Sequence, residues 1–266
     1  MGQIWIPARR QSTRLSEKLL RFVDGRPLLA YTLERAQAAA SLLRWNPAQS
    51  IRVVTDCHEL AAIAEASGVM AIHIDMPCAS GTERLARAWR ALEPESRPDW
   101  LINLQGDEPL IPPALVAGLA QLMASNVEVA MGTVMRPGVW EDGAVSVVVD
   151  RADRALYFSR QPLPGRHPSQ TTEPKAEMAP AWGTHVGLYG YRGHVLDQWL
   201  EWCPGPLEVQ EGLEQLRALE YGMTLAVLRA DAVVDPDDRP WFSIDTEQDL
   251  RRFEARRRGG AVGGSP

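Results

Sequence analysis

The chain of 266 residues carries 28 lysines and arginines against 34 aspartates and glutamates, and 45% of its residues are hydrophobic. The formal net charge is −6, and apart from the run Arg256–Arg258 no dense basic cluster suggests the basic face that nucleic-acid binding requires. The apolar runs are too short to span a membrane. The cysteines Cys57, Cys78 and Cys203 have neither the number nor the spacing of a disulfide framework or a CxxC metal pair. With no signal-peptide pattern at the N-terminus, we expect a cytoplasmic protein without nucleic-acid or membrane partners.

Short apolar segments alternate with helical patterns up to about residue 140. We expect strands at Gln3–Pro7, Ile51–Thr55, Met70–Ile74, Trp100–Gln105 and Val127–Val134. We expect helices at Pro27–Ala40, His58–Ala66, Thr82–Leu92 and Pro113–Ala124. Strands that alternate with helices of this length are joined by right-handed crossovers. The pattern therefore predicts an α/β fold with a mostly parallel sheet that is covered on both faces.

The second half of the chain follows a different pattern. Its expected strands are Ala144–Val149, Ala155–Ser159, Gly183–Tyr191 and Leu225–Leu228, and its expected helices are Gly193–Trp202, Leu207–Tyr221 and Thr246–Arg256. The proline-rich stretch 160–182 is expected to be an extended, mobile loop, and the glycine-rich tail 259–266 to be disordered. Ligands of open α/β sheets bind outside the carboxyl ends of the strands, so the loops after the strands are the candidate sites.

The loop after the first strand is the first candidate for a phosphate site. It carries the basic residues Arg9, Arg10, Arg14 and Lys18 together with the hydroxyls of Ser12 and Thr13. The chain lacks the GxGxxG and GxxxxGK[ST] patterns, so a phosphate would have to be held by basic side chains on irregular loops. Several cations that converge on a triphosphate would also stabilise the departing pyrophosphate. The same residues also fit a solvated surface loop.

Acidic residues follow the fourth strand and precede the last helix. Asp107 lies in the stiff turn 105–109, and a carboxylate at a strand end is typical of Mg²⁺ sites, although it also fits a helix cap. Asp245 precedes Thr246, the expected N-cap of the last helix, and an acid there is commonly a cap itself.

Two helices offer further polar groups. If residues 207–221 form one helix, Glu208, Glu211 and Gln215 share a face that could receive sugar hydroxyls or simply contact water. The helix that begins within residues 80–84, with Thr82 as the expected cap, offers backbone amides to an anion or a base.

Taken in order, these blocks resemble the CMP-Kdo synthetase family, the 3-deoxy-manno-octulosonate (Kdo) cytidylyltransferases. The resemblance runs from Ile4 to about Arg256. The matching blocks are Pro7–Lys18, Ser80–Leu85, Gln105–Pro109, Ala155–Arg160, His185–Arg192, Leu213–Arg217 and Asp245–Thr246.

The resemblance implies a three-layer α/β/α nucleotidyltransferase fold with a mostly parallel central sheet and a β-rich arm that forms a homodimer. It also implies a single domain at residues 1–258, with a nucleotide-binding half at 1–140 and a sugar-binding and dimerisation part at 141–230. The implied reaction joins CTP and Kdo to give CMP-Kdo and pyrophosphate, a cytoplasmic step that supplies lipopolysaccharide synthesis.

The resemblance also implies roles for individual residues. Arg9, Arg14 and Lys18 would hold the triphosphate of CTP, with Ser80, Gly81 and Arg84 near the cytidine. Asp107 and Asp245 would bind Mg²⁺ and act with Lys18 and Arg14 in catalysis. Gln105, Arg160, His185, Tyr189, Glu211 and Gln215 would surround the sugar acid. Arg160 can pair bidentately with the carboxylate of the sugar, and positioning with electrostatics would carry the displacement without a covalent enzyme intermediate.

The chain departs from the family pattern in three places. Residues 15–20 lack the prolines and the glycine of the family's Leu-Pro-Gly-Lys-Pro-Leu, and Glu17 brings an acid close to the triphosphate site. Residues 242–244 differ from the family's short run before Asp245, and the loop 160–182 is longer than usual. The resemblance implies Kdo rather than its 8-amino analogue, since relatives that use the analogue differ in both blocks 106–109 and 189–192. The open alternatives are a catalytically weakened homologue that binds sugar acid or nucleotide, a transferase for a related sugar acid, and a metal-dependent pyrophosphohydrolase.

Overall fold

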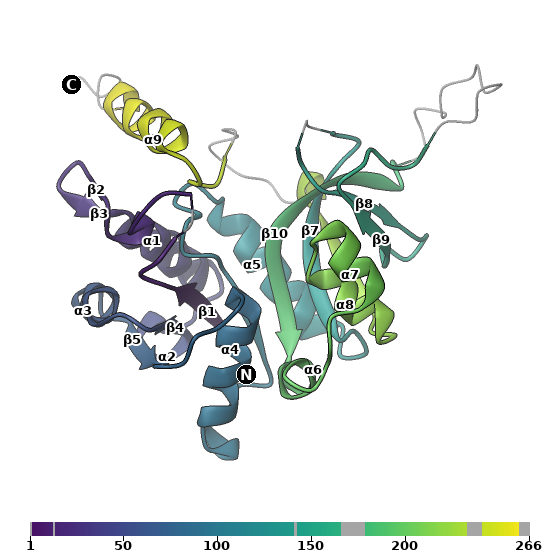
Figure 1. Ribbon diagram of the computed structural model, residues 1–266, viewed down its shortest axis with the longest axis horizontal. Coiled ribbons are helices and arrows are strands. Elements are labelled where there is room, and N and C mark those ends of the chain that lie inside the picture. The colour runs from purple at the N-terminus through teal and green to yellow at the C-terminus, as the bar shows by residue number, and fades with distance from the viewer. Residues whose placement is uncertain (1, 13, 141–142, 166–178, 233–240, 261–266) are drawn as a thin grey trace.

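A mixed sheet forms the centre of the protein (Figure 1). The computed structural model describes residues 2–12, 14–140, 143–165, 179–232 and 241–260. Within these residues the strand order is β11-β7-β10-β6-β1-β4-β5, and β8 and β9 extend the sheet from β10. The strands are β1 (Gly2–Ala8), β4 (Ile51–Thr55), β5 (Met70–His73), β6 (Trp100–Asn103), β7 (Met131–Pro137), β8 (Ser146–Val149), β9 (Ala155–Ser159), β10 (Trp182–Arg192) and β11 (Leu225–Arg229). A separate small hairpin pairs β2 (Phe22–Val23) with β3 (Arg26–Pro27).

Strand β10 is the exception in a sheet whose central strands otherwise run in one direction. It pairs antiparallel with β6 and β7, whereas β1, β4 and β5 pair in parallel, as do β7 and β11. The parallel strands are linked through helices, but β10 follows the β8–β9 hairpin, so its direction is not set by a helical crossover. The prediction of a mostly parallel sheet is confirmed.

Helices cover both faces of the sheet and complete three layers. They are α1 (Leu28–Leu42), α2 (Pro47–Ser50), α3 (His58–Ala66), α4 (Gly81–Ala91), α5 (Pro113–Ser125), α6 (Gly193–Trp199), α7 (Pro206–Glu211), α8 (Gln215–Glu220) and α9 (Glu247–Gly260). Alternate side chains of strand β1 point to opposite faces of the sheet. Because helices cover both faces, the strand is buried on both sides. Ile4 and Ile6 pack in the core that contains α1 and α5, whereas Trp5 packs in the core that contains α4 and α6.

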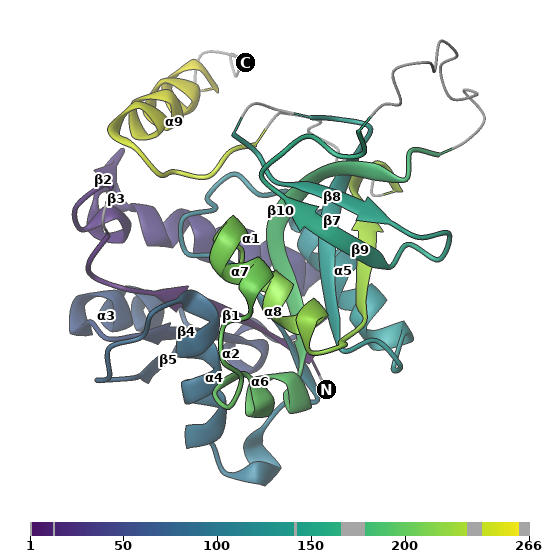
Figure 2. The ribbon, with the colours of Figure 1, turned by 45° about the vertical axis from the view of Figure 1, so that its right-hand side comes forward.

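The strands β8 and β9 form an arm at the opposite end of the sheet from β5 (Figure 2). β8 pairs with both β10 and β9, while β9 has β8 as its only ladder partner among the described strands. The helices α7 and α8 lie next to this arm, and α8 contacts β9. The two halves of the chain are therefore joined through one continuous sheet.

The predicted single helix at 207–221 is wrong. The chain leaves α7 at Gly212, whose φ of +62° lies in the left-handed region that glycine adopts at little cost, and α8 then begins on a new axis. The face on which Glu208, Glu211 and Gln215 were expected to meet therefore does not form.

Smaller differences concern the ends of elements. The fifth strand starts at Met131 rather than 127, and the helix after β10 ends at Trp199 rather than 202. Ser80, not Thr82, caps α4, because the Ser80 hydroxyl accepts the Glu83 amide at 3.1 Å. Helix α9 continues through residue 260, into the tail that was expected to be disordered, and residues 261–266 lie outside the described chain. So does the central part of the predicted loop 160–182, at 166–178.

Candidate active site

A cavity of about 260 Å³ opens at the carboxyl ends of β1 and β6. Its walls come from the loop after β1, the loop after β6 and the start of α4. The carboxyl ends of neighbouring parallel strands lie at the same edge of a sheet, which brings these three distant segments together. The predicted site residues that line it are Arg9, Lys18, Ser80, Gly81, Arg84, Gln105 and Asp107.

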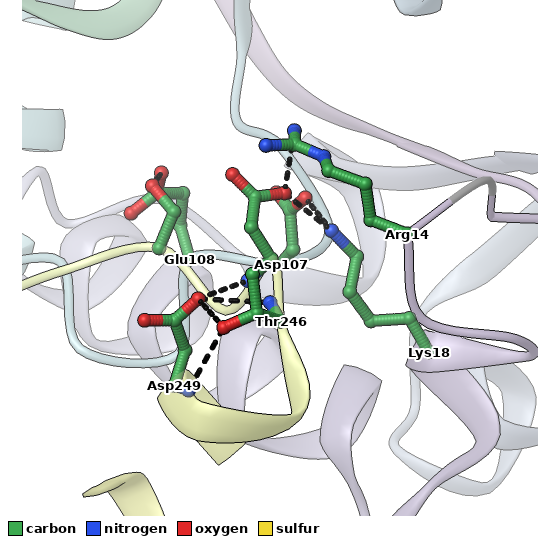
Figure 3. A network of polar contacts seen from close by, with 8 residues as sticks. Arg14, Lys18, Asp107, Glu108, Thr246 and Asp249 are labelled. Carbon is green, nitrogen blue, oxygen red and sulfur yellow. Dashed lines mark hydrogen bonds and ion pairs between the residues drawn. The ribbon is translucent and has the colours of Figure 1, made fainter. Parts of the chain in front are cut away.

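At one side of this cavity, Lys18 holds two carboxylates together (Figure 3). Its Nζ is 2.5 Å from Asp107 Oδ2 and 3.0 Å from Asp245 Oδ1, and Arg14 Nη2 lies 3.0 Å from the same Asp245 oxygen. Burial lowers the pKa of Lys18, but the two carboxylates outweigh it, so the net pKa is raised and the ammonium stays charged. The four residues predicted to act in catalysis are thus one cluster of paired charges.

The backbone places Asp245 in this cluster. The Ile244 amide donates to the Asp107 carbonyl at 3.0 Å, which fixes the segment before α9 against the loop after β6. Thr246 then starts α9: its hydroxyl accepts the Asp249 amide at 3.2 Å, and the Asp249 carboxylate accepts the Thr246 amide at 2.8 Å. The predicted cap is correct, and it leaves the carboxylate of Asp245 free of capping and turned to Lys18.

Glu108 adds a third acid behind the pair. Burial raises the pKa of Glu108 to about 8, the charge of Asp107 pushes it the same way, and the Ser243 hydroxyl that donates to Glu108 opposes both. Glu108 is therefore mostly protonated at neutral pH. The charges that remain in the cluster are the two aspartates, balanced by Lys18 and Arg14.

The residues present fit a magnesium ion. Mg²⁺ commonly takes one or two carboxylates together with phosphate oxygens and water, and Asp107 and Asp245 already converge on a single cation. No group of three or more His, Cys, Asp and Glu side chains is arranged to hold a metal ion within the described residues, so an all-protein cage is not what this site offers.

Arg84 supplies the positive wall of the cavity from α4. Its side chain is 4% exposed, and its Nη2 donates to Asp56 Oδ2 at 2.7 Å. The other terminal nitrogen, Nη1, has no hydrogen-bond partner among the described residues. A buried guanidinium N–H without a partner costs free energy, and Nη1 is such a group on a residue that lines the cavity.

The residues predicted to bind the sugar acid, Gln105 excepted, are not among those that line this cavity. Arg160 contacts Glu211, and His185 contacts Tyr189. Arg160, just after β9, donates from Nε to the Glu211 carbonyl at 2.7 Å and from Nη2 to the Gly212 carbonyl at 3.2 Å. The carboxylate of Glu211 accepts from the Ser159 hydroxyl at 2.8 Å and from the Arg160 amide at 2.9 Å. Arg160 thus sits at the carboxyl end of α7, where the negative end of the helix dipole favours a cation.

His185 and Tyr189 project from β10. The ring of His185 lies 5.2 Å from those of Phe158 and Tyr189, and its Nε2 is 2.9 Å from the Thr133 hydroxyl. Burial lowers the pKa of His185 to about 3, so the ring is neutral at physiological pH. Gln215 on α8 is 4% exposed, and its amide nitrogen has no hydrogen-bond partner among the described residues.

Comparison with known proteins places this geometry in a family. A cytidylyltransferase family model matches residues 4–225. The 3-deoxy-manno-octulosonate cytidylyltransferase of Anaeromyxobacter sp. (strain Fw109-5) is 40% identical over 254 residues, 94% of this chain and 94% of the relative. The chain belongs to this family.

Further similarities agree with this assignment. The 3-deoxy-manno-octulosonate cytidylyltransferase of Cellvibrio japonicus (strain Ueda107) is 36% identical over 94% of this chain and 95% of its own length. A solved CMP:2-keto-3-deoxy-manno-octonic acid synthetase complexed with CTP matches with a TM-score of 0.80 and 29% identity, over 97% of this chain and 99% of that chain. A nucleotidyl transferase from Methanothermobacter thermautotroptrophicus matches at 16% identity with a TM-score of 0.58, which shows the fold alone. No helix among the described residues is long and apolar enough to cross a membrane.

Glu17, the acid that this family member carries next to Lys18, does not line the cavity. Its carboxylate is 2.9 Å from Arg10 Nε, and Arg10 Nη1 is 2.9 Å from Glu59 of α3. Its backbone is left-handed, with φ of +49°. Glu17, which departs from the family pattern, is therefore paired locally with Arg10.

Two residues of this cytidylyltransferase site were missed from the sequence. Glu214 lines the cavity and lies close to Ser80 and Thr82 at the start of α4, whose hydroxyls oppose the rise in its pKa that burial causes. Asp56 follows β4 at the same edge of the sheet and pairs with Arg84. An acid directly after a predicted strand was the available signal for Asp56. Nothing in the sequence distinguishes Glu214 from Glu211 until the break at Gly212 is known.

Proposed function

We propose that the protein transfers CMP from CTP to Kdo, releasing pyrophosphate and forming CMP-Kdo. The observation that carries the proposal is the pair Asp107 and Asp245, held around one ammonium at the edge of a cavity with arginine and amide groups on its other walls. Relatives up to 40% identical over nearly the whole chain bear the name of this activity.

Arg9, Arg14 and Lys18 would hold the triphosphate, and Ser80, Gly81 and Arg84 would lie near the cytidine. The support is that all but Arg14 line one cavity. These cations would neutralise the charge that grows on the α-phosphoryl group and on pyrophosphate, which is the main demand of phosphoryl transfer. Mg²⁺ bound by Asp107 and Asp245 would lower the pKa of the anomeric hydroxyl and bring it next to the α-phosphate.

Gln105, Arg160, His185, Tyr189, Glu211 and Gln215 would bind the sugar acid. Gln105 lines the nucleotide cavity, and the unpaired amide nitrogen of Gln215 offers a donor to a sugar oxygen. Arg160 uses two of its guanidinium N–H groups on the end of α7, so α7 would orient the arginine for a carboxylate. The neutral ring of His185 would hydrogen-bond a hydroxyl without adding charge.

The proposal extends to the division of roles along the chain, the oligomeric state and the cellular location. We place nucleotide binding mainly in residues 1–140, sugar binding and dimerisation in 141–230, and CMP-Kdo formation in the cytoplasm, ahead of lipopolysaccharide synthesis. A homodimer through the arm is supported by β9, a strand at the edge of the described sheet, and by its Leu156, whose side chain is 61% exposed. Val209 of the adjacent α7 is 71% exposed. Light scattering on the purified protein tests the dimer, and a monomer at working concentration contradicts it.

The reaction is tested by incubating the purified protein with CTP, Kdo and Mg²⁺ and following pyrophosphate and CMP-Kdo. Equal release of both products is expected. Pyrophosphate without Kdo in the mixture would indicate a hydrolase, and binding without turnover would indicate a weakened homologue. A panel that includes 8-amino-Kdo and other sugar acids tests the preference for Kdo.

A further inference from the structure

Lys18 bridges the carboxylates of Asp107 and Asp245, on which the proposed metal site depends. Its ammonium bonds one oxygen of Asp107 and one of Asp245, at 2.5 and 3.0 Å. The side chain of Lys18 is 9% exposed, whereas those of the two aspartates are 25% and 33% exposed. The lysine is thus the inner member of the cluster, and the protein itself supplies the positive charge that this pair of acids requires.

A divalent cation that bridges the two carboxylates needs an oxygen from each of them. Lys18 now uses one from each, and an ammonium held this close to a divalent ion would be strongly repelled in a partly buried site. The ammonium and the cation therefore compete for the same pair of carboxylates. Lys18 also lines the nucleotide cavity, so its stem already lies next to the place where a triphosphate would bind.

We propose that Lys18 is the resident counter-ion of Asp107 and Asp245, and that the divalent cation takes its place and releases the ammonium to the triphosphate. The inference rests on the proposed function, which assigns the two aspartates to Mg²⁺. The position of this one side chain would then couple metal binding to nucleotide binding. Because linkage is reciprocal, the cation would tighten nucleotide binding through Lys18, and the nucleotide would tighten binding of the cation by the same factor.

Arg14 provides a matched control. It also carries one positive charge to the cluster, but it contacts Asp245 alone, at 3.0 Å, and its side chain is 66% exposed. Removing Arg14 takes away a charge without clearing the position between the carboxylates. Any general effect of net charge on metal affinity should therefore appear in both variants, and the effect of displacement in Lys18→Met alone.

The first experiment is a calorimetric titration of the nucleotide-free, full-length protein with Mn²⁺ alone. Lys18→Met should bind the ion roughly tenfold tighter than wild type or more, and Arg14→Met roughly threefold tighter or less, because the charge of Arg14 is screened by water and salt. Equal gains in the two variants, or no gain in Lys18→Met, would overturn the exchange.

A second readout needs no variant. The chain contains two lysines, Lys18 and Lys175, so protein labelled with ¹⁵N at the lysine side chains gives two ammonium signals and Lys175 serves as the internal reference. Saturating Mg²⁺, judged from the calorimetric isotherm, should shift or remove the Lys18 signal. An unchanged Lys18 signal at saturation would overturn the proposal even if Lys18→Met does not fold. Exchange without CMP-Kdo formation would instead refute the proposed function and leave the exchange standing.

Discussion

The two sides of the proposed active site are built in different ways. On the nucleotide side, Arg9, Gln105 and Asp107 reach one cavity because they follow neighbouring parallel strands. On the sugar side, Arg160 and Glu211 come from the arm and from α7, and they are held by bonds to each other. Backbone topology organises the first side, and hydrogen bonds between side chains and backbone organise the second. A substitution on the sugar side should therefore disturb neighbouring residues more than a substitution on the nucleotide side does.

The largest expected effect is a loss of turnover when the nucleotide side is altered. Asp107→Asn and Asp245→Asn should each lower kcat by about 100- to 1,000-fold, because each removes a charge on which the cation and Lys18 depend. Circular dichroism should show an intact fold, since the sheet does not involve either side chain. Asp75→Asn changes a carboxylate that is 87% exposed and serves as the control, with near-normal turnover expected. Near-normal kcat of either site variant at low Mg²⁺ contradicts the assignment.

The next test removes a predicted substrate contact on the sugar side. Arg160→Ala should raise the KM for Kdo by roughly tenfold to a hundredfold and leave the KM for CTP nearly unchanged, because a charged hydrogen-bonding partner of the substrate is lost. Arg160→Lys keeps the charge without the fork and should recover only part of the loss. Arg151→Ala, at an exposed turn before β9, should behave as wild type. A raised KM for CTP alone would move Arg160 to the other side of the site.

A pH experiment tests the burial of His185 on the sugar side. The folded pKa of His185 is about 3 and the ordinary value is 6.5, so between these limits the unfolded chain binds more protons. The stability that depends on a neutral His185 ring is fully present above pH 6.5 and is lost as the pH falls toward 3. The loss is no more than about 1.4 kcal/mol of unfolding free energy per pH unit. Urea unfolding at pH 7.5 and 5.5 should therefore show a smaller loss in His185→Gln than in wild type. Identical losses would show that the imidazole is hydrated.

The smallest expected effect concerns the turn that separates α7 from α8. Gly212→Ala should cost about 1–2 kcal/mol of unfolding free energy, because φ of +62° is unfavourable for a residue with a Cβ. The added methyl group would lie 3.9 Å from Arg160 Nη2, an ordinary van der Waals contact, so the KM for Kdo should stay nearly unchanged. Gly187→Ala is the matched control, since a Cβ there meets no atom within 4 Å. Equal stability of the two variants contradicts the strain at residue 212.

The contrast between the sides also explains what the sequence could predict. The alternation of apolar segments and helices in residues 1–140 was enough for the parallel sheet, and hence for the convergence of Arg9, Gln105 and Asp107. Helical spacing failed at residues 207–221 because Gly212 stops α7, and a single glycine in an otherwise helical pattern does not by itself decide between a break and a continued helix.

Interactions between distant side chains were beyond sequence reasoning. The family resemblance placed Lys18 with the triphosphate and Asp245 with the metal, but not the bond between them, which depends on how the segment before α9 packs against the loop after β6. Glu214 was missed for a similar reason, since its contact with the start of α4 exists only after the chain turns at Gly212.

The hydrogen bond from the Ile244 amide to the Asp107 carbonyl joins a segment that follows every strand of the sheet to the middle of the chain. During translation the sheet can therefore assemble before the second carboxylate has emerged from the ribosome. A nascent chain that is folded up to β11 would contain the cavity but only half of the carboxylate pair. The ability to join nucleotide and sugar would then arise only when the last segment docks.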